Sequence, residues 1–254
     1  MNQPLLKVDN VSRSFGGVTA VNEVSLSVAA GQRVAVIGPN GAGKSTLAGC
    51  VAGSTSVSSG SVFYEGRDIN RMSAQARSRR GISRTFQNLE LFVSMTALDN
   101  VLLAVDAISG WGSSIHPARA RAKRDRAMDA LGALGISKYA ETKTGSMPYG
   151  IRKLVELSRA FVTEPKLLLL DEPVAGLTDT ETFLDVLHEG LDQLQCSVML
   201  IEHDMATVQR LCQHVYVLDS GRLIASGTYE QVAKDPRVVE AYLGSSGNAH
   251  NNAT

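Results

Sequence analysis

The glycine-rich run GPNGAGKS, at residues 38–45, constrains the fold of this chain more than any other feature. It follows the continuous apolar run of residues 34–37 and precedes residues 45–47, the order in which a buried parallel strand leads into a helix. It fits the pattern GxxxxGK[ST], in which glycines allow a tight turn and backbone N–H groups point inward at the positive end of the helix. The run therefore predicts a cradle for phosphate groups.

Two side chains of this loop predict how a nucleoside triphosphate is held. Lys44 can reach the β and γ phosphates, and the Ser45 hydroxyl can bind Mg²⁺. We therefore expect the chain to bind ATP with Mg²⁺. The residues expected to contact the nucleotide from this loop are Gly38, Pro39, Asn40, Gly41, Ala42, Gly43, Lys44, Ser45 and Thr46.

Two carboxylates follow a second apolar run, LLLL at residues 167–170. The buried strand that this run predicts delivers Asp171 and Glu172 to its carboxyl end, the edge where open α/β sheets bind ligands. Asp171 is the expected Mg²⁺ partner, and Glu172 is placed to orient and deprotonate a water directed at the γ phosphate. An acidic pair after an apolar run is common, so its meaning depends on the phosphate loop.

Three further side chains are candidates for the same site. A third apolar run, residues 198–201, ends in Glu-His-Asp, so His203 is expected at the same sheet edge and in contact with the γ phosphate. Gln87 ends the run of residues 81–86 and can reach water or Mg²⁺. Phe15, beside Gly16-Gly17, is either an ordinary core residue or an aromatic ring that stacks on adenine.

Hydrophobic periodicity divides the chain. Alternation predicts N-terminal strands at residues 7–12 and 24–28, and residues 214–219 and 222–226 flank a two-residue turn typical of a hairpin. Helical periodicity runs from about residue 89 to 157. Within it lies a basic run, interpreted as a solvated helix face, that contains Arg119, Arg121, Lys123, Arg124 and Arg126.

Composition limits the alternatives. The longest apolar run, residues 101–105, is far short of the roughly 20 residues of a membrane-spanning helix, and no secretory signal is evident, so a cytoplasmic location is expected. Lys+Arg 25 balance Asp+Glu 25, so the chain as a whole has no charge that would attract nucleic acid.

The order of the motifs resembles the nucleotide-binding subunits of ABC transporters up to Leu243: GPNGAGKST, TFQ, PYGIRKLVELSRAF, LLLLDEP and IEHD. FGGVTAVNEVSLSV, SRTFQNLELF and EAYLG are similar to the ATPase subunits of branched-chain amino acid importers. The resemblance implies an α/β fold: a P-loop NTPase (RecA-like) core with an antiparallel N-terminal β subdomain and an inserted helical subdomain. The expected parts are a core of residues 1–88 and 158–243, a helical subdomain of residues 89–157, and a disordered tail of residues 244–254.

The resemblance also implies roles and partners. Phe15 would stack on adenine, Gln87 would couple the site to the membrane subunits, Glu172 would be the catalytic base, and His203 would contact the γ phosphate. The expected partners are a second ATPase subunit, two transmembrane permease subunits and, indirectly, a solute-binding protein, at the cytoplasmic face of the cell membrane. No nucleic acid partner is expected.

The signature loop departs from the family's commonest form, LSGGQ, which is replaced here by residues 147–151, MPYGI. In the family this loop contacts the γ phosphate held by the opposite subunit, so Tyr149 and Gly150 are candidate contacts. Pro148 removes a hydroxyl and a backbone donor, while Gly150 keeps its N–H. Thr178 stands where many relatives have aspartate. These departures predict that the second ATPase subunit is a different chain, so that the two composite sites are unequal; the alternative is a homodimer.

Two other functional classes stay open. A soluble ABC ATPase acting on DNA or ribosomes is favoured only by the basic run at residues 119–126, and it is disfavoured by the single phosphate loop and the absence of cysteine pairs for zinc. A subunit that signals without turnover is suggested by Pro148.

Overall fold

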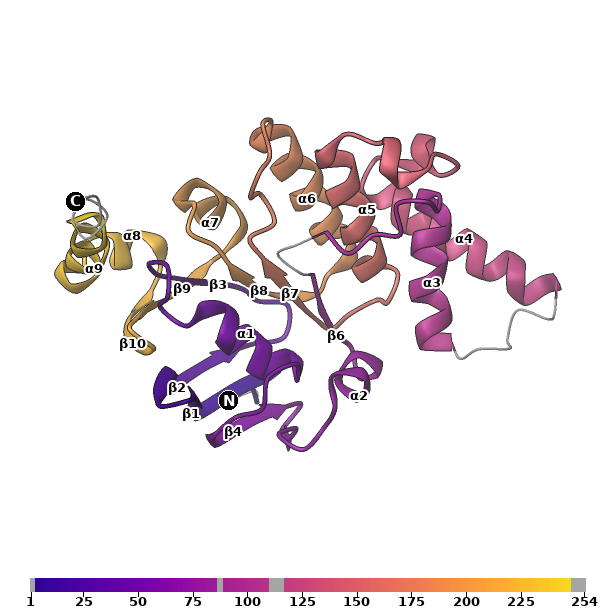
Figure 1. Ribbon diagram of the computed structural model, residues 1–254. Helices are drawn as coiled ribbons and strands as arrows, with labels where there is room; N and C mark the ends of the chain where they lie inside the picture. Colours follow the sequence, from indigo (N-terminus) through magenta and orange to yellow (C-terminus); the bar gives the residue numbers. More distant parts are fainter. Residues whose placement is uncertain (1–2, 86–88, 110–116, 248–254) are drawn as a thin grey trace. The chain divides into compact units, whose positions relative to one another are not determined.

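The computed structural model describes residues 3–85, 89–109 and 117–247, which form two compact units (Figure 1). Unit 1 comprises Met1–Arg80, Leu169–Glu172 and Ser197–Thr254, and unit 2 comprises Gly81–Leu168 and Pro173–Cys196. The division differs from the expected boundaries, because residues 158–168 and 173–196 cluster with the helical part rather than with the core.

One sheet of unit 1 is antiparallel, with strand order β2-β1-β4-β5. β1 pairs with β2 and β4 on its two sides, so that Leu6 lies opposite both Val28 and Tyr64. All three of these side chains are buried, whereas Lys7 between the inward residues is exposed, as the period of two along a strand requires. The strands are β1 (Leu6–Phe15), β2 (Val18–Val28), β4 (Ser59–Tyr64) and β5 (Arg67–Asp68).

The second sheet of unit 1 follows the order β10-β9-β3-β8-β7, to which β7 contributes residues 169–171. β3 is parallel to both β8 and β9, and every residue of β3, β7 and β8 is buried, as expected for central strands covered on both faces. The three apolar runs are therefore confirmed as strands, and so is the hairpin of β9 with β10. The strands are β3 (Arg33–Ile37), β7 (Leu167–Asp171), β8 (Ser197–Ile201), β9 (His214–Asp219) and β10 (Arg222–Gly227).

Two helices of unit 1, α2 and α7, begin at side chains that accept hydrogen bonds from their first turn. Ser73 accepts from the Ala76 N–H, and Asp204 accepts from the Thr207 N–H. The helices are α1 (Lys44–Ala52), α2 (Ala74–Arg79), α7 (Met205–Leu211), α8 (Tyr229–Ala233) and α9 (Pro236–Gly247). α9 packs on α8 and β10 and continues to Gly247, and the rest of the expected tail lies outside the described residues.

Unit 2 is mainly helical, and α3, α4 and α5 pack against one another. Gly190 of α6 allows close packing, because a Cβ there would lie 2.8 Å from Leu134 Cδ2 and 2.9 Å from Phe161 Cε2. The elements are β6 (Ile82–Arg84), α3 (Ala97–Ser109), α4 (Pro117–Ala133), η2 (Ser137–Tyr139), η3 (Thr144–Ser146), α5 (Tyr149–Phe161) and α6 (Thr180–Leu194).

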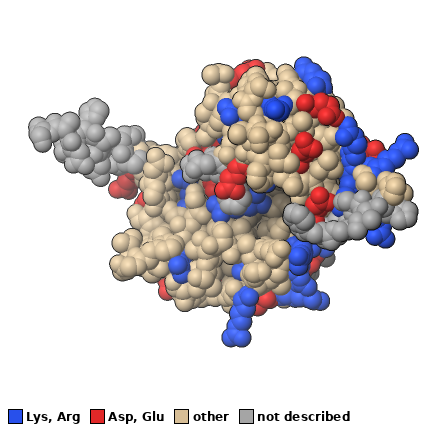
Figure 2. All heavy atoms as spheres, turned by 45° about the vertical axis from the view of Figure 1, so that its right-hand side comes forward, with Lys and Arg blue, Asp and Glu red and all other residues tan. Residues whose placement is uncertain are grey.

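The basic run on α4 is not simply a solvated face. Lys123 is buried and pairs with Asp106, so the interpretation is wrong for this residue. Two further ion pairs connect α4 to other parts of unit 2, Arg124 with Glu141 at 2.6 Å and Arg126 with Glu164 at 3.0 Å. Basic and acidic side chains also occur together on the face drawn in Figure 2.

Among the residues that the structure describes, no helix combines the length and apolar character needed to span a membrane.

Candidate functional site

The phosphate loop connects β3 to α1 and accepts only glycine at two positions. A Cβ on Gly38, whose φ is 147°, would lie 2.0 Å from the Leu218 carbonyl oxygen, and one on Gly43, whose φ is 96°, would lie 2.2 Å from the Ala20 carbonyl oxygen. The first turn of α1 carries no acidic side chain, so the positive end of the helix is not neutralised from within the helix. This loop matches the expected anion cradle.

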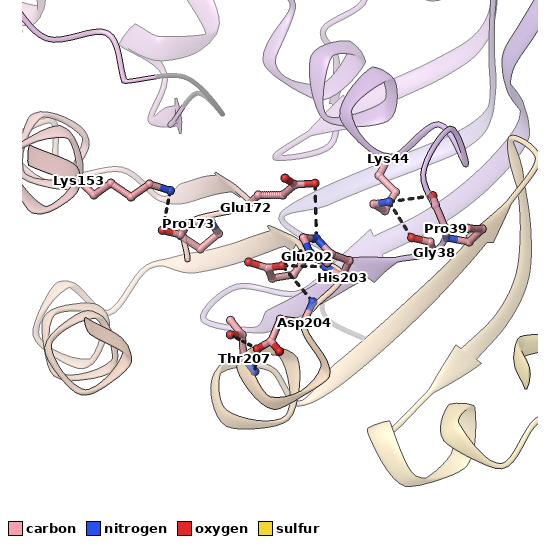
Figure 3. Close-up of polar contacts among 10 residues, drawn as sticks. All are labelled: Gly38, Pro39, Lys44, Lys153, Glu172, Pro173, Glu202, His203, Asp204 and Thr207. Atoms are coloured by element: carbon pink, nitrogen blue, oxygen red, sulfur yellow. Dashed lines mark hydrogen bonds and ion pairs between the residues drawn. The ribbon is translucent and has the colours of Figure 1, made fainter. Parts of the chain in front are cut away.

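Lys44 is folded over this loop. Its side chain is buried, and Nζ donates to the carbonyl oxygens of Gly38 at 2.7 Å and Pro39 at 3.0 Å (Figure 3). Burial lowers the pKa of Lys44, and the carboxylates of Glu172, Asp171 and Glu202 raise it part of the way back. Three carboxylates from two other strand ends therefore act on the same ammonium group.

Glu172 follows β7 in a strained backbone conformation. Its φ is 48°, a left-handed value that is uncommon for residues other than glycine and costs of order 1 kcal/mol. The Glu172 N–H donates to the Ile201 carbonyl oxygen at 2.9 Å, which holds this conformation at the end of β8. Asp171, one residue earlier, is 3% exposed. Strain of this kind is concentrated at functional sites.

His203 lies beside Glu172, as expected from neighbouring strands. Its Nδ1 atom is 3.7 Å from Glu172 Oε1 and 3.5 Å from Glu202 Oε2, and 56% of its side chain is exposed. Asp204 then begins α7 by accepting from the Thr207 N–H and hydroxyl, and the Thr207 hydroxyl holds the pKa of Asp204 below its ordinary value. The structure thus brings Lys44, Glu172 and His203 together in unit 1.

The other expected residues fall into three groups. Gln87 lies outside the described residues. Phe15 is 47% exposed and is not a core residue, and the Arg13 guanidinium carbon lies 4.2 Å from the centre of its ring. Tyr149 and Gly150 begin α5 in unit 2.

The signature loop lines an apolar cavity of about 440 Å³ within unit 2. Tyr149 packs on the loop after β7: a Cβ on Gly176 would lie 3.3 Å from Tyr149 Cε1. Pro148 and Thr178, the two departures from the family pattern, line this same cavity.

Some residues near the site have no recognisable sequence signal. Lys153 of α5 is buried, and its Nζ donates to the Pro173 carbonyl oxygen at 3.0 Å, directly after Glu172. Glu202 is fully buried beside His203. Burial raises the pKa of Tyr242 on α9 to about 12, against the lowering effect of a hydrogen bond with the Gly38 backbone. For Glu202, the one available signal was its position directly after the apolar run of β8, which places it at the sheet edge.

The donor chemistry around Lys44 fits Mg²⁺. Ser45 is exposed as the second residue of α1, and the Asp171 carboxyl ends β7 and interacts with Lys44. Hydroxyl and carboxylate oxygens are ligands that Mg²⁺ prefers, together with phosphate oxygens and waters.

Comparisons with known proteins agree with this geometry. Residues 21–175 match the "ABC transporter" family, and residues 222–247 match the "Branched-chain amino acid ATP-binding cassette transporter" family. The chain is 37% identical to BraF of Pseudomonas aeruginosa and 36% identical to LivG of Escherichia coli, each a "high-affinity branched-chain amino acid transport ATP-binding protein". Both alignments cover 96% of this chain and 99% of the relative.

Solved structures show the same fold. The chain is similar to MJ1267, an ATP-binding cassette of an ABC transporter, with a TM-score of 0.83, 30% identity, and coverage of 95% of this chain and 99% of that chain. Against the ADP conformation of MJ1267 the TM-score is 0.79 at 30% identity, with 96% of this chain and 100% of that chain covered.

Proposed function

Since this chain belongs to the family of ABC transporter ATP-binding proteins, we propose that it hydrolyses ATP to power the import of branched-chain or related amino acids. The choice of solute is supported by the names of its relatives and by the family matched at residues 222–247. The observation that carries the hydrolytic role is the Glu172–His203 pair at the sheet edge. At this edge the Glu172 charge also acts on Lys44 and raises its pKa.

In this proposal the phosphate loop binds the β and γ phosphates of ATP. Lys44 exchanges the carbonyl oxygens of Gly38 and Pro39 for phosphate oxygens, which are charged and therefore stronger acceptors. The backbone N–H groups of the loop and the start of α1 add a positive field. The Phe15 ring offers an exposed aromatic face for adenine.

The reaction transfers the γ phosphoryl group to water. The water oxygen forms a bond to the γ phosphorus, the bond to the β–γ bridging oxygen breaks, and Glu172 accepts a proton from the water; the products are ADP and phosphate. His203 contacts the γ phosphate. Ser45, Asp171 and, from the sequence, Gln87 would hold Mg²⁺ bound with ATP, which would supply positive charge to neutralise the phosphates.

The proposal includes a dimeric assembly on a membrane. A second ATPase subunit, a different chain by preference, would place its nucleotide against Tyr149 and Gly150 of this chain. Two transmembrane permease subunits would be moved by closure of this dimer at the cytoplasmic face of the membrane. A solute-binding protein would deliver the amino acid to the permease.

Transport by reconstituted vesicles tests the proposal. Proteoliposomes with the chain, its permease subunits and its binding protein should accumulate labelled leucine, isoleucine or valine only with ATP inside, and Lys44→Ala should abolish both uptake and phosphate release. Uptake of glutamate or ribose in their place would contradict the solute assignment. ATP binding without phosphate release in this assembly would contradict hydrolysis and favour signalling without turnover.

A further inference from the structure

We propose that Glu202 is a positioning residue for His203: its buried carboxylate accepts the imidazole Nδ1–H and thereby leaves the Glu172 carboxylate available to the attacking water. The inference rests on the proposed function, in which Glu172 is the base. In that proposed function, Glu202 does not contact the nucleotide.

The first step concerns the backbone. Glu202 follows β8 directly, and its N–H lies 3.4 Å from the Val36 carbonyl oxygen of the neighbouring strand. Its Oε2 atom accepts the N–H of His203 at 2.8 Å and of Asp204 at 3.1 Å (Figure 3). One buried oxygen therefore closes the turn that presents the His203 side chain.

The second step concerns the imidazole. His203 Nδ1 lies 3.5 Å from the same Oε2 atom of Glu202 and 3.7 Å from Glu172 Oε1. In a neutral imidazole Nδ1 carries at most one hydrogen, so the two carboxylates compete for a single donor. If Nδ1–H turns to Glu172, it occupies an oxygen of the proposed base. If it turns to Glu202, that oxygen is free, and Nε2 is left to face the γ phosphate, to which it can donate only when the imidazole carries a second hydrogen.

The third step concerns cost. Glu202 is 0% exposed, and its Oε1 atom is buried without a hydrogen-bond partner among the described residues. Burial raises the pKa of Glu202, while the N–H groups of Asp204 and His203 lower it. Burying an apolar side chain at this position would cost less free energy than burying a carboxyl group with an unsatisfied oxygen. A role in orienting His203 accounts for the glutamate.

The test replaces Glu202 with glutamine. Glu202→Gln keeps the shape and one carbonyl oxygen for the two backbone N–H groups, but it removes the charge that attracts Nδ1–H. We expect kcat for ATP hydrolysis to fall about tenfold, the difference between a charged and a neutral hydrogen-bond acceptor, with KM changed by less than about twofold. Glu240→Gln, the same change at an exposed glutamate, is the matched control and should leave kcat unchanged.

A spectroscopic readout separates positioning from stability. Nitrogen-15 spectra of the histidine side chains, recorded above about pH 8, where histidine is ordinarily neutral, report which ring nitrogen carries the proton. A His203→Gln spectrum assigns the resonance. The parent should show His203 protonated at Nδ1, and Glu202→Gln should shift it toward Nε2. A parent protonated at Nε2 overturns the proposal whether or not the variant folds.

The remaining outcomes are distinct. An unchanged kcat and tautomer in Glu202→Gln overturn the positioning role, and so does a lower kcat that only follows a lower melting temperature with the tautomer unchanged. Neither result affects the proposed function, provided that the parent hydrolyses ATP and Glu172→Gln does not. A Glu172→Gln variant with parental activity would instead overturn the assignment of Glu172 as the base, together with this inference, which depends on it.

Discussion

The phosphate-loop edge of unit 1 and the signature-loop side of unit 2 use glycine in opposite ways. At Gly38 and Gly43 an added Cβ would overlap backbone oxygens of this chain, so its own packing demands glycine. At Gly150 the nearest atom to an added Cβ is Leu177 Cδ2 at 3.5 Å, an ordinary contact. In the described part of unit 2 no atom lies close enough to require glycine at this position, so its role there is left to the proposed contact with a second subunit's nucleotide. In the proposed dimer, the first region would hold this chain's own nucleotide, and the second would face a nucleotide held by the other subunit.

The largest expected effect is on nucleotide binding through Lys44. Lys44→Ala removes two or three hydrogen bonds from a charged donor, each contributing about 1.5 kcal/mol or more, so the Kd for ATP should rise about a hundredfold to a thousandfold or more. Calorimetric titration measures the affinity, and a melting curve checks that the chain stays folded. A folded variant with the parental affinity for ATP would show that the phosphate loop does not bind the nucleotide.

Turnover should respond next. Glu172→Gln should lower kcat by a factor of about 100 to 10,000, the usual contribution of a general base, and leave ATP binding intact. Such a protein should accumulate as an ATP-bound dimer, visible by size-exclusion chromatography. Parental hydrolysis would show that another group removes the proton.

The contrast between Gly38 and Gly150 can be tested by measuring the free energy of unfolding of alanine variants. Gly38→Ala should lower the free energy of unfolding by about 3 kcal/mol or more, since the overlapped atom is a backbone carbonyl. Gly150→Ala, inside the first turn of α5, should be neutral or stabilising by up to about 1 kcal/mol, yet should weaken ATP-dependent dimerisation. Equal losses of stability at both positions would contradict the contrast.

The smallest expected effect concerns Pro148. Pro148→Ser restores a hydroxyl and a backbone donor, and at about 1 kcal/mol per hydrogen bond it should tighten the ATP-bound homodimer roughly fivefold or more. Sedimentation of both forms in a Glu172→Gln background measures this change. A strong parental homodimer that Pro148→Ser leaves unaltered would argue against unequal sites.

Local patterns predict the elements of the site better than the contacts within it. The phosphate loop and the buried strands are readable because glycine requirements and apolar runs are local properties. The placement of His203 at the sheet edge that carries Glu172 also followed, because strand ends meet at one edge, although the contact between the two side chains was not predicted. The left-handed backbone of Glu172 and the inward carboxyl of Glu202 depend on hydrogen bonds to residues distant in sequence or on burial by them. The same holds for Lys123, whose partner Asp106 lies on another helix.

The buried hydrogen bond from Lys153 to the Pro173 carbonyl oxygen couples the conformation of α5 to that of the peptide after Glu172. Separating them would leave a buried charged donor without this acceptor, at a cost of about 1.5–3 kcal/mol, so conformers in which α5 and Pro173 move independently are populated about ten- to a hundredfold less. Coupling of this kind is reciprocal. In the proposed dimer, a nucleotide that drew the start of α5 toward the second subunit would bias the peptide after Glu172, and a γ phosphate that reordered Glu172 would bias α5 by the same free energy.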